Sequence, residues 1–128
     1  MEQDIFGKKK RLNLFLAFEG ATNRKPVGYA LYYFTYSSFL ARPTLFLEDL
    51  FVDQRFRGKG GGRKLFLACV KEAKAKNCGR MEWAVLTWNK NAIDFYERAG
   101  ARRLSEWYYY RMDSETIEKS LQKEVTSC

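Results

Sequence analysis

Two acidic side chains interrupt a strongly apolar segment, and their position calls for a chemical explanation. Residues 45–52 read Leu-Phe-Leu-Glu-Asp-Leu-Phe-Val, with Glu48 and Asp49 at the centre. A purely structural strand disfavours charges there, because an unpaired buried carboxylate is costly. The chain has no histidine, so carboxylates are left to act as a base near neutral pH. Neighbouring side chains on a strand point to opposite faces, so only a β-bulge would bring both acids to one site. The alternative is a pair of surface acids on an edge strand.

A basic, glycine-rich segment follows at once. Residues 55–64, Arg-Phe-Arg-Gly-Lys-Gly-Gly-Gly-Arg-Lys, hold four glycines and five cations between a predicted strand and a predicted helix. Exposed backbone N–H groups, the helix dipole and the cations favour an anion there. The segment lacks the Gly-Lys-Ser/Thr of a Walker loop, and Arg63 replaces the third glycine of the dinucleotide motif. The alternatives are a flexible basic turn and, given the net charge of +8, a nucleic-acid contact.

Several strands are predicted around these segments from β-branched and aromatic runs. They cover residues 12–18, 27–36, 45–52, 81–87 and 107–111, with a turn at 19–23 and a loop at 37–43. The strand at 81–87 reads as fully buried and as a parallel neighbour of 45–52, joined to it by a helix. Ligands of such sheets bind where strands end.

Two helices are predicted after the glycine-rich segment. The first ends at Asn77 and Gly79, and its inner stripe comprises Leu65, Phe66, Cys69, Val70 and Ala73. In the second, Asn91 and Asp94 resemble a capping box, and the helix stops at Gly100. Its inner stripe comprises Ala92, Phe95, Tyr96 and Ala99. The charged segment 114–124 reads as a surface helix or a loose tail.

Length and composition favour one domain. The 128 residues, 46% of them hydrophobic, suit a single domain over 1–128 with a core at 12–111 and a tail at 112–128. Three cysteines without close pairing, and no histidine, argue against a metal site and favour a reducing compartment. The apolar stretch after Lys8–Arg11 is too short for a membrane span. We therefore expect a cytoplasmic protein with no membrane partner.

Two motifs carry a family resemblance. Arg57-x-x-Gly60-x-Gly62 resembles the acetyl-CoA pyrophosphate loop of the GNAT superfamily of N-acetyltransferases, and the segment from Asn89 through Tyr96 to Ala101 resembles its second signature. Within that superfamily the chain is similar to the diamine acetyltransferases, namely the spermidine/spermine enzyme and its thialysine relative. That similarity rests on Gly28–Tyr36, Leu47–Val52 and Trp83–Asn89.

The resemblance implies a fold and partners. The expected fold is an α/β (α+β) sandwich, a mixed central sheet with helices on both faces, here truncated at its amino-terminal strand and helices. The expected co-substrate is acetyl-CoA, with no metal. A homodimer is implied too, with the aromatic residues 107–110 as a plausible contact.

The resemblance also assigns residues to the coenzyme. The pantetheine would lie along the strand end and the pyrophosphate on the glycine-rich segment. The expected coenzyme-binding residues are Leu50, Phe51, Val52, Arg57, Gly58, Lys59, Gly60, Gly61, Gly62, Arg63, Asn89, Asn91, Ala92 and Tyr96. Asn89 would bind the pantetheine or, alternatively, cap its helix.

Acetyl transfer to an amine needs a base and an acid. A primary amine has a pKa of about 10.4, so it must lose a proton before attack. Glu48 is expected as base, directly or through water, with Asp49 second, and both as acceptor-binding residues. Tyr96, by resemblance, protonates the coenzyme thiolate; the alternative is that it only fills its helix stripe. Cys69 lies on a buried stripe, which argues against an acyl-cysteine and favours direct attack in a ternary complex.

The expected function is acetylation of a small diamine, polyamine or thialysine-like amine. Ser37 stands where the polyamine-type enzymes carry an acid, and this favours small diamines or thialysine-like acceptors over spermine. Two alternatives stay open: an acetyl-CoA-binding protein without turnover, and a basic nucleic-acid-binding module.

Overall fold

The computed structural model describes residues 1–20 and 25–122. The chain forms two compact units, Met1–Val85 and Leu86–Cys128. Part of the predicted turn at 19–23 lies outside the described residues. Within those residues, no helix is both long and apolar enough to cross a bilayer.

The first unit is built on a four-stranded mixed sheet with the order β1-β2-β3-β4. The strands are β1 (Asn13–Glu19), β2 (Lys25–Ser37), β3 (Arg42–Val52) and β4 (Arg80–Trp83). β1, β2 and β3 pair antiparallel, whereas β3 and β4 pair parallel. The predicted mixed sheet and its parallel pair are therefore confirmed. β2 and β3 extend further than predicted, which shortens the loop at 37–43 to a turn.

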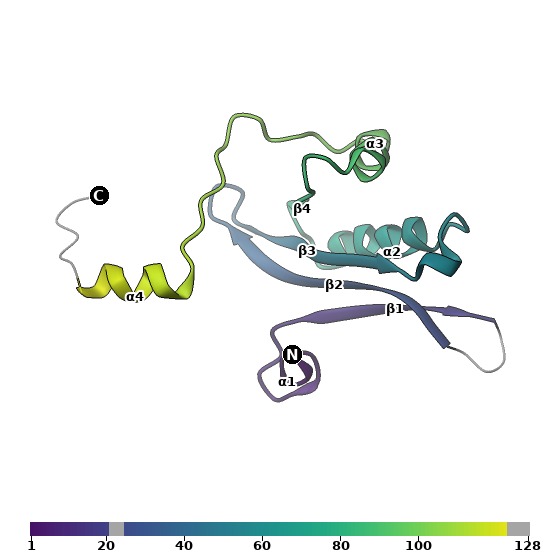
Figure 1. The fold of residues 1–128 in the computed structure, drawn as a ribbon, viewed down its shortest axis with the longest axis horizontal. Helices are drawn as coiled ribbons and strands as arrows, with labels where there is room; N and C mark the ends of the chain where they lie inside the picture. The colour runs from purple at the N-terminus through teal and green to yellow at the C-terminus, as the bar shows by residue number, and fades with distance from the viewer. Residues whose placement is uncertain (21–24, 123–128) are drawn as a thin grey trace. The chain divides into compact units, whose positions relative to one another are not determined.

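Helix α2 (Gly61–Ala75) connects β3 to β4 and packs on one face of the sheet (Figure 1). Four residues of its predicted inner stripe are buried: Leu65, Phe66, Cys69 and Ala73. Val70 is 40% exposed, so its predicted place in the stripe is wrong; it lies at the edge of the apolar face. Asn77 ends the helix region with a left-handed φ of 57°, a conformation that asparagine tolerates better than most residues.

The core lies between α2 and the sheet. β2 contributes Ala30 and Tyr32, and β3 contributes Leu45 and Leu47, all at most 4% exposed. The Tyr32 hydroxyl donates a hydrogen bond of 2.9 Å to Oε2 of Glu72 on α2. This bond satisfies the one polar atom that Tyr32 brings into the core.

The predicted buried strand at 81–87 is wrong in length and in burial. β4 ends at Trp83, none of its residues is fully buried, and 84–87 are exposed. The last pair of the ladder joins Leu47 to Trp83, and the next residue of β3 is the extra residue of a bulge. A bulge bends its strand and disrupts the ladder, which explains why pairing stops there.

Short helices lie at both ends of the chain. Helix α1 (Glu2–Phe6), which precedes β1, was not expected from the sequence. In the second unit, α3 (Lys90–Arg98) and α4 (Ser114–Gln122) match the predicted helices. The predicted strand at 107–111 is wrong: Trp107–Tyr110 are irregular and 71–89% exposed. Aromatic side chains favour strands only where a neighbouring strand offers a surface to pack on.

Candidate functional site

A β-bulge in β3 sets the position of the two acids. Leu31 of β2 faces Asp49, and the next residue, Tyr32, faces Leu47. Glu48 is therefore the extra residue, without a partner in β2. β3 is an inner strand of the sheet, but it pairs with β4 only over residues 44–47. Glu48 and Asp49 are exposed and lie where β3 has only β2 beside it within the described sheet, so the alternative of surface acids stays open on exposure alone.

Two tyrosines of β2 show where the carboxylates lie. The Tyr29 hydroxyl donates to Oδ2 of Asp49 at 2.8 Å, and the Tyr33 hydroxyl donates to Oε2 of Glu48 at 3.4 Å. Tyr29 and Tyr33 are four residues apart on one strand and thus on one face. The bulge therefore places both acids on that face. A bulge is the condition for a site that both acids share.

The acid pair is exposed and has no cationic partner among the residues that the structure describes. Neither Glu48 nor Asp49 forms an ion pair with any lysine or arginine among residues 1–20 and 25–122. Two adjacent carboxylates without a countercharge attract a cation from solution.

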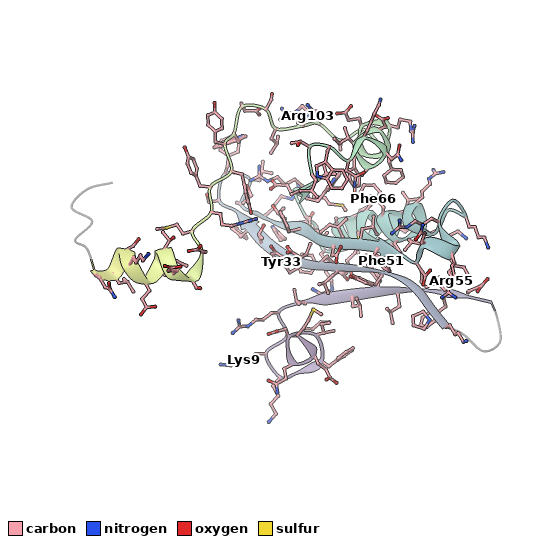
Figure 2. All side chains as sticks on the ribbon, in the orientation of Figure 1. Lys9, Tyr33, Phe51, Arg55, Phe66 and Arg103 are labelled. Carbon is pink, nitrogen blue, oxygen red and sulfur yellow. The ribbon has the colours of Figure 1, made fainter. Side chains whose placement is uncertain are left out.

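Aromatic rings flank the acids on the same face. The Tyr29 and Phe51 rings lie 5.6 Å apart, and the Tyr33 and Phe46 rings 5.3 Å apart. Tyr33, Phe51 and then Arg55 follow one another toward the loop end of β3 (Figure 2). Aromatic faces attract organic cations and pack against methylene groups. The face thus suits an alkyl chain that carries ammonium groups.

Ser37 has a structural role. Its side chain is 3% exposed, accepts a 2.6 Å hydrogen bond from Arg80 and accepts another from the Leu40 backbone at 3.1 Å. Arg80 in turn pairs with Glu82 at 3.0 Å. Ser37 therefore anchors the turn between β2 and β3.

The glycine-rich loop exposes backbone donors at the start of α2. Gly58 and Gly60 have φ of 81° and 84°, a region that side chains disfavour. Gly60 is the N-cap of α2 and offers no side-chain cap. The first intrahelical bond runs from the Lys64 N–H to the Gly60 carbonyl, which leaves the N–H groups of the first turn available for an anion.

Gly61 and Gly62 have room for a side chain. A Cβ atom at either position would come no closer than 3.8 Å to another atom, a methyl carbon of Val52, and neither residue has a left-handed φ. The fold alone therefore does not require glycine at these two positions. A ligand that approaches the backbone closely would require it.

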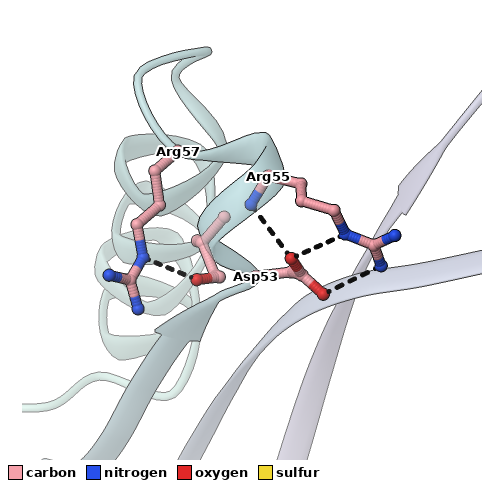
Figure 3. A network of polar contacts seen from close by, with 4 residues as sticks. Asp53, Arg55 and Arg57 are labelled. Atoms are coloured by element: carbon pink, nitrogen blue, oxygen red, sulfur yellow. Dashed lines mark hydrogen bonds and ion pairs between the residues drawn. The ribbon is translucent and has the colours of Figure 1, made fainter.

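One cation of the loop is neutralised within the chain. Arg55 pairs with Asp53 through two side-chain contacts of 3.3 Å (Figure 3). Its backbone N–H also donates to Asp53 Oδ1 at 3.0 Å. The hydrogen bonds from Arg55 lower the pKa of the Asp53 carboxyl. This pair caps the short 3-10 helix η1 (Gln54–Phe56).

The other loop cations have no acidic partner. Arg57 donates from Nε to the Val52 carbonyl at 2.9 Å and lies over the Phe51 ring, 5.8 Å from its centroid. Lys59 lies over the Phe56 ring at 5.4 Å. In the part of the chain that the structure describes, no ion pair involves the side chains of Arg57, Lys59, Arg63 or Lys64. The positive charge of the loop is therefore available to an anion.

The end of β3 has one unpaired edge. Leu50, Phe51 and Val52 pair with Ala30, Tyr29 and Gly28 of β2. On its other side, β3 pairs with β4 only over residues 44–47. The backbone of residues 50–52 can thus accept an extended ligand as an additional strand.

The second unit holds the remaining predicted residues: Asn89, Asn91, Ala92 and Tyr96. Asn89 is the N-cap of α3 and its Oδ1 accepts from the Ala92 N–H at 3.3 Å. The predicted capping box is wrong, because Asn91 already lies in the first turn and Asp94 pairs with Lys90 at 3.7 Å. Burial raises the pKa of the Tyr96 hydroxyl, which keeps it protonated near neutral pH.

The structure adds residues that sequence reasoning missed. Tyr29 and Tyr33 lie within the predicted strand at 27–36, and their spacing of four places them on one face, a signal that was available. Cys69 is fully buried, and burial raises the pKa of its thiol to about 11. This protonated thiol is poorly suited to act as a nucleophile. The described residues contain no group of three or more Cys, Asp or Glu side chains placed to hold a metal ion.

A bulged inner strand followed by a glycine loop and a helix N-terminus defines an α/β protein with a candidate anion site at a strand end. Residues 2–101 match the model of the acetyltransferase (GNAT) family, and the chain belongs to that family, as predicted. It is 41% identical over 96 residues to a thialysine N-epsilon-acetyltransferase of Sus scrofa, covering 73% of this chain and 56% of that protein. It is 40% identical over 91 residues to an L-ornithine N5-acetyltransferase of Arabidopsis thaliana, covering 71% and 40%.

A solved structure supports the fold. An integron cassette protein from the mobile metagenome of V. cholerae superposes with a TM-score of 0.81 at 28% identity, over 92% of this chain and 71% of that chain. The chain spans about half the length of the curated relatives it matches first.

Proposed function

We propose that this chain transfers the acetyl group of acetyl-CoA to a primary amine of a small diamine, polyamine or thialysine-like acceptor. The observation that carries the proposal is the bulge at Glu48, which places two exposed acids without a countercharge on one face of β3. The same strand runs directly into the cationic glycine loop. One strand thus joins a face suited to a cation and a loop suited to an anionic coenzyme.

Acetyl-CoA is the proposed acetyl donor, as family membership implies. Its pyrophosphate would bind the N–H groups of residues 58–63 with Arg57, Lys59 and Arg63, and its pantetheine would pair with residues 50–52. Asn89, Asn91, Ala92 and Tyr96 complete the proposed coenzyme contacts. The Asn89 amide oxygen already caps α3, so any pantetheine contact of that side chain would come from its NH₂ group.

The proposed chemistry is direct attack. Glu48 would take a proton from the acceptor ammonium, directly or through water, and the free amine would attack the thioester carbonyl. The carbon–sulfur bond then breaks, and Tyr96 would protonate the departing thiolate. The second proton that the attacking nitrogen loses would return to the Tyr96 oxygen through water, which leaves the amide, the free coenzyme thiol and a protonated Glu48. Partial burial raises the pKa of the Tyr96 hydroxyl, so this group still carries its proton at neutral pH when the thiolate departs.

Ornithine and thialysine appear in the names of two similar proteins, and each acceptor joins an alkyl chain to amino groups. The aromatic face with its paired acids suits that chemistry. Ser37 is buried and hydrogen-bonded to Arg80, so it adds no charge for a long polycation. Small diamines and thialysine-like amines are therefore the proposed acceptors.

The proposal also covers the oligomeric state, the location and the domain organisation of the protein. A homodimer is supported by the exposed aromatic residues Trp107–Tyr110. Sedimentation of the wild type and of Tyr109→Ser tests it. We expect the variant to dissociate. The free thiols of Cys69 and Cys78 suit the predicted cytoplasmic location. Residues 1–128 stay predicted as one domain, with a core at 12–111.

A thiol-release assay with acetyl-CoA tests the function. Putrescine, spermidine, spermine, thialysine and lysine serve as acceptors, alongside calorimetric titration of the coenzyme. Turnover that is fastest with the small acceptors is the expected result. Coenzyme binding without turnover would instead support a coenzyme-binding protein, and binding to a DNA duplex that coenzyme does not displace would support a nucleic-acid module.

A further inference from the structure

Of the two tyrosine hydroxyls that bond to the acids, that of Tyr29 makes the shorter hydrogen bond. Its hydroxyl lies 2.8 Å from Asp49 Oδ2, and its ring is tilted against Phe51 at 5.6 Å between centroids. In the register Tyr29 faces Phe51, two residues beyond Asp49. The ring contact limits where the hydroxyl can lie, and the hydroxyl in turn limits the orientation of the carboxylate.

The Tyr29 hydroxyl is a donor throughout the neutral range. Its hydrogen bond to Asp49 is the main cause that raises its pKa, followed by burial and by the charge of Asp49. A protonated phenol that donates to a carboxylate makes a charge-assisted hydrogen bond, which is stronger than one between neutral groups.

The second acid is held more loosely. The Tyr33 hydroxyl is 3.4 Å from Glu48 Oε2, near the limit for a hydrogen bond. Glu48 also occupies the bulge, so no residue of β2 stands opposite it in the strand register. The two acids therefore differ. The Asp49 carboxylate is held in one orientation, whereas the Glu48 carboxylate can reorient to accept a proton.

We infer that Tyr29 is a positioning residue, which orients Asp49 to bind the second, non-reacting ammonium of a dicationic acceptor. This inference rests on the proposed function and assigns separate tasks to the two acids. A fixed carboxylate binds a distal ammonium with little loss of side-chain entropy. Discrimination between a diamine and a monoamine of the same length would then depend on the Tyr29 hydroxyl.

The chain offers a matched control. Tyr36 lies on the same strand, is 68% exposed, and makes no hydrogen bond through its hydroxyl within the described residues. Its spacing from Tyr29 is odd, so it lies on the other face of β2. Tyr29→Phe and Tyr36→Phe each remove one hydroxyl and keep the ring.

The first experiment compares 1,4-diaminobutane with butylamine as acceptors in the thiol-release assay. For Tyr29→Phe we expect KM for the diamine to rise about tenfold, the effect of losing a hydrogen bond to a charged group. We expect kcat for the diamine and KM for butylamine to stay within about twofold of the wild type. Tyr36→Phe should change none of these values. Equal effects of the two variants on the diamine would overturn the inference.

A double-mutant cycle isolates the pair. In an Asp49→Asn background, Tyr29→Phe should add little further loss of diamine affinity, because its partner carboxylate is already gone. Additive losses would mean that Tyr29 acts without Asp49 and would overturn the inference.

Binding of 1,4-diaminobutane, followed by NMR titration with coenzyme present, separates this inference from the proposed function. If the wild type turns over no amine, the proposed function fails. A diamine affinity about tenfold weaker in Tyr29→Phe than in Tyr36→Phe would then still support the positioning role. No diamine binding by the wild type would overturn that role.

Discussion

The Nε atom of Arg57 donates a hydrogen bond to the Val52 carbonyl at 2.9 Å. Arg57, a cation of the glycine loop, is thus tied to the last residue of β3. The terminal nitrogens of its guanidinium make no hydrogen bond within the described chain. Arg57 can therefore shape the loop and offer positive charge at once.

This bond predicts how substitutions at Arg57 behave. A glutamine amide can still donate to the Val52 carbonyl. We expect Arg57→Gln to keep coenzyme affinity within about threefold, and Arg57→Met to weaken it about tenfold, as the loss of a charge-assisted hydrogen bond does. Calorimetry with acetyl-CoA measures both. Equal losses in the two variants would show that the charge alone matters.

The room beside Gly62 allows a test that separates binding from folding. A Cβ atom there would meet only a methyl carbon of Val52, at 3.8 Å. Gly62→Val should therefore keep the melting temperature within a few degrees, which is about 1 kcal/mol for a domain of this size. The side chain would block close approach of the pyrophosphate, and we expect coenzyme affinity to fall at least about tenfold. Gly62→Ala is the smaller control, and normal coenzyme affinity in Gly62→Val would contradict the proposed pyrophosphate site.

Glu48 should affect turnover more than coenzyme binding. Glu48→Gln keeps the shape of the side chain and removes the base, so kcat should fall by about 10²-fold or more, the usual contribution of a general base. Acetyl-CoA affinity should not change, because Glu48 lies outside the glycine loop. Steady-state kinetics with the best acceptor and calorimetry with the coenzyme check this pair of results. A kcat within twofold of the wild type would remove Glu48 from the base role.

Four elements of the sheet unit, β1, β2, β3 and α2, follow from local patterns. Aromatic and β-branched runs predicted β1, β2 and β3, and the apolar spacing predicted α2. The bulge was less visible, because nothing in the sequence states whether adjacent acids lie on opposite faces or share one. Pairing with β2 decides that point: Leu31 faces Asp49 and Tyr32 faces Leu47.

Other errors arose where an element depends on a partner. The segment Trp107–Tyr110 has strand-forming residues but pairs with no strand in the described chain. β4 stops at Trp83 because the ladder ends next to the bulge. The sequence offered both Asn91, in a capping box, and Asn89 as the cap of α3; the structure confirms Asn89, and only the backbone geometry separates these two chemically equal residues. Local composition could not settle these three cases.

The buried bond between Tyr32 and Glu72 predicts a cost in stability. Tyr32→Phe leaves Glu72 without its donor, and we expect the free energy of unfolding in urea to fall by about 1–3 kcal/mol. Tyr36→Phe, at an exposed position, should change it by less than about 0.5 kcal/mol. An unchanged midpoint in Tyr32→Phe would mean that water replaces the lost bond.

The same tyrosine predicts a pH dependence. Burial, and then the hydrogen bond to Glu72, raise the pKa of Tyr32 above its ordinary value. A raised pKa in the folded state means that the stabilisation is complete below pH of about 10, the unfolded value, and declines as pH rises toward the folded value. The difference in stability between the wild type and Tyr32→Phe should therefore shrink above pH 10. Urea titrations at pH 8 and pH 11 measure it, and a constant difference would contradict the assignment.

Tyr96 has two alternative roles, proton donor and packing residue, and the pH dependence of kcat bears on them. Burial raises the pKa of its hydroxyl, so the group stays protonated through neutral pH and loses its proton only above pH of about 10. If Tyr96 protonates the thiolate, ionisation of Tyr96 should not lower kcat between pH 7 and 10.

Tyr96→Phe completes this test, because it keeps the ring and removes only the hydroxyl group. We expect kcat to fall by about 10²-fold or more, with acetyl-CoA affinity within about threefold of the wild type. Phe95, whose ring lies 5.4 Å from that of Tyr96 on α3, supplies the comparison for packing: Phe95→Leu should lower the melting temperature more than Tyr96→Phe does, and lower kcat less. A normal kcat in Tyr96→Phe would leave Tyr96 as a packing residue of its helix and would require another donor, such as water, for the thiolate.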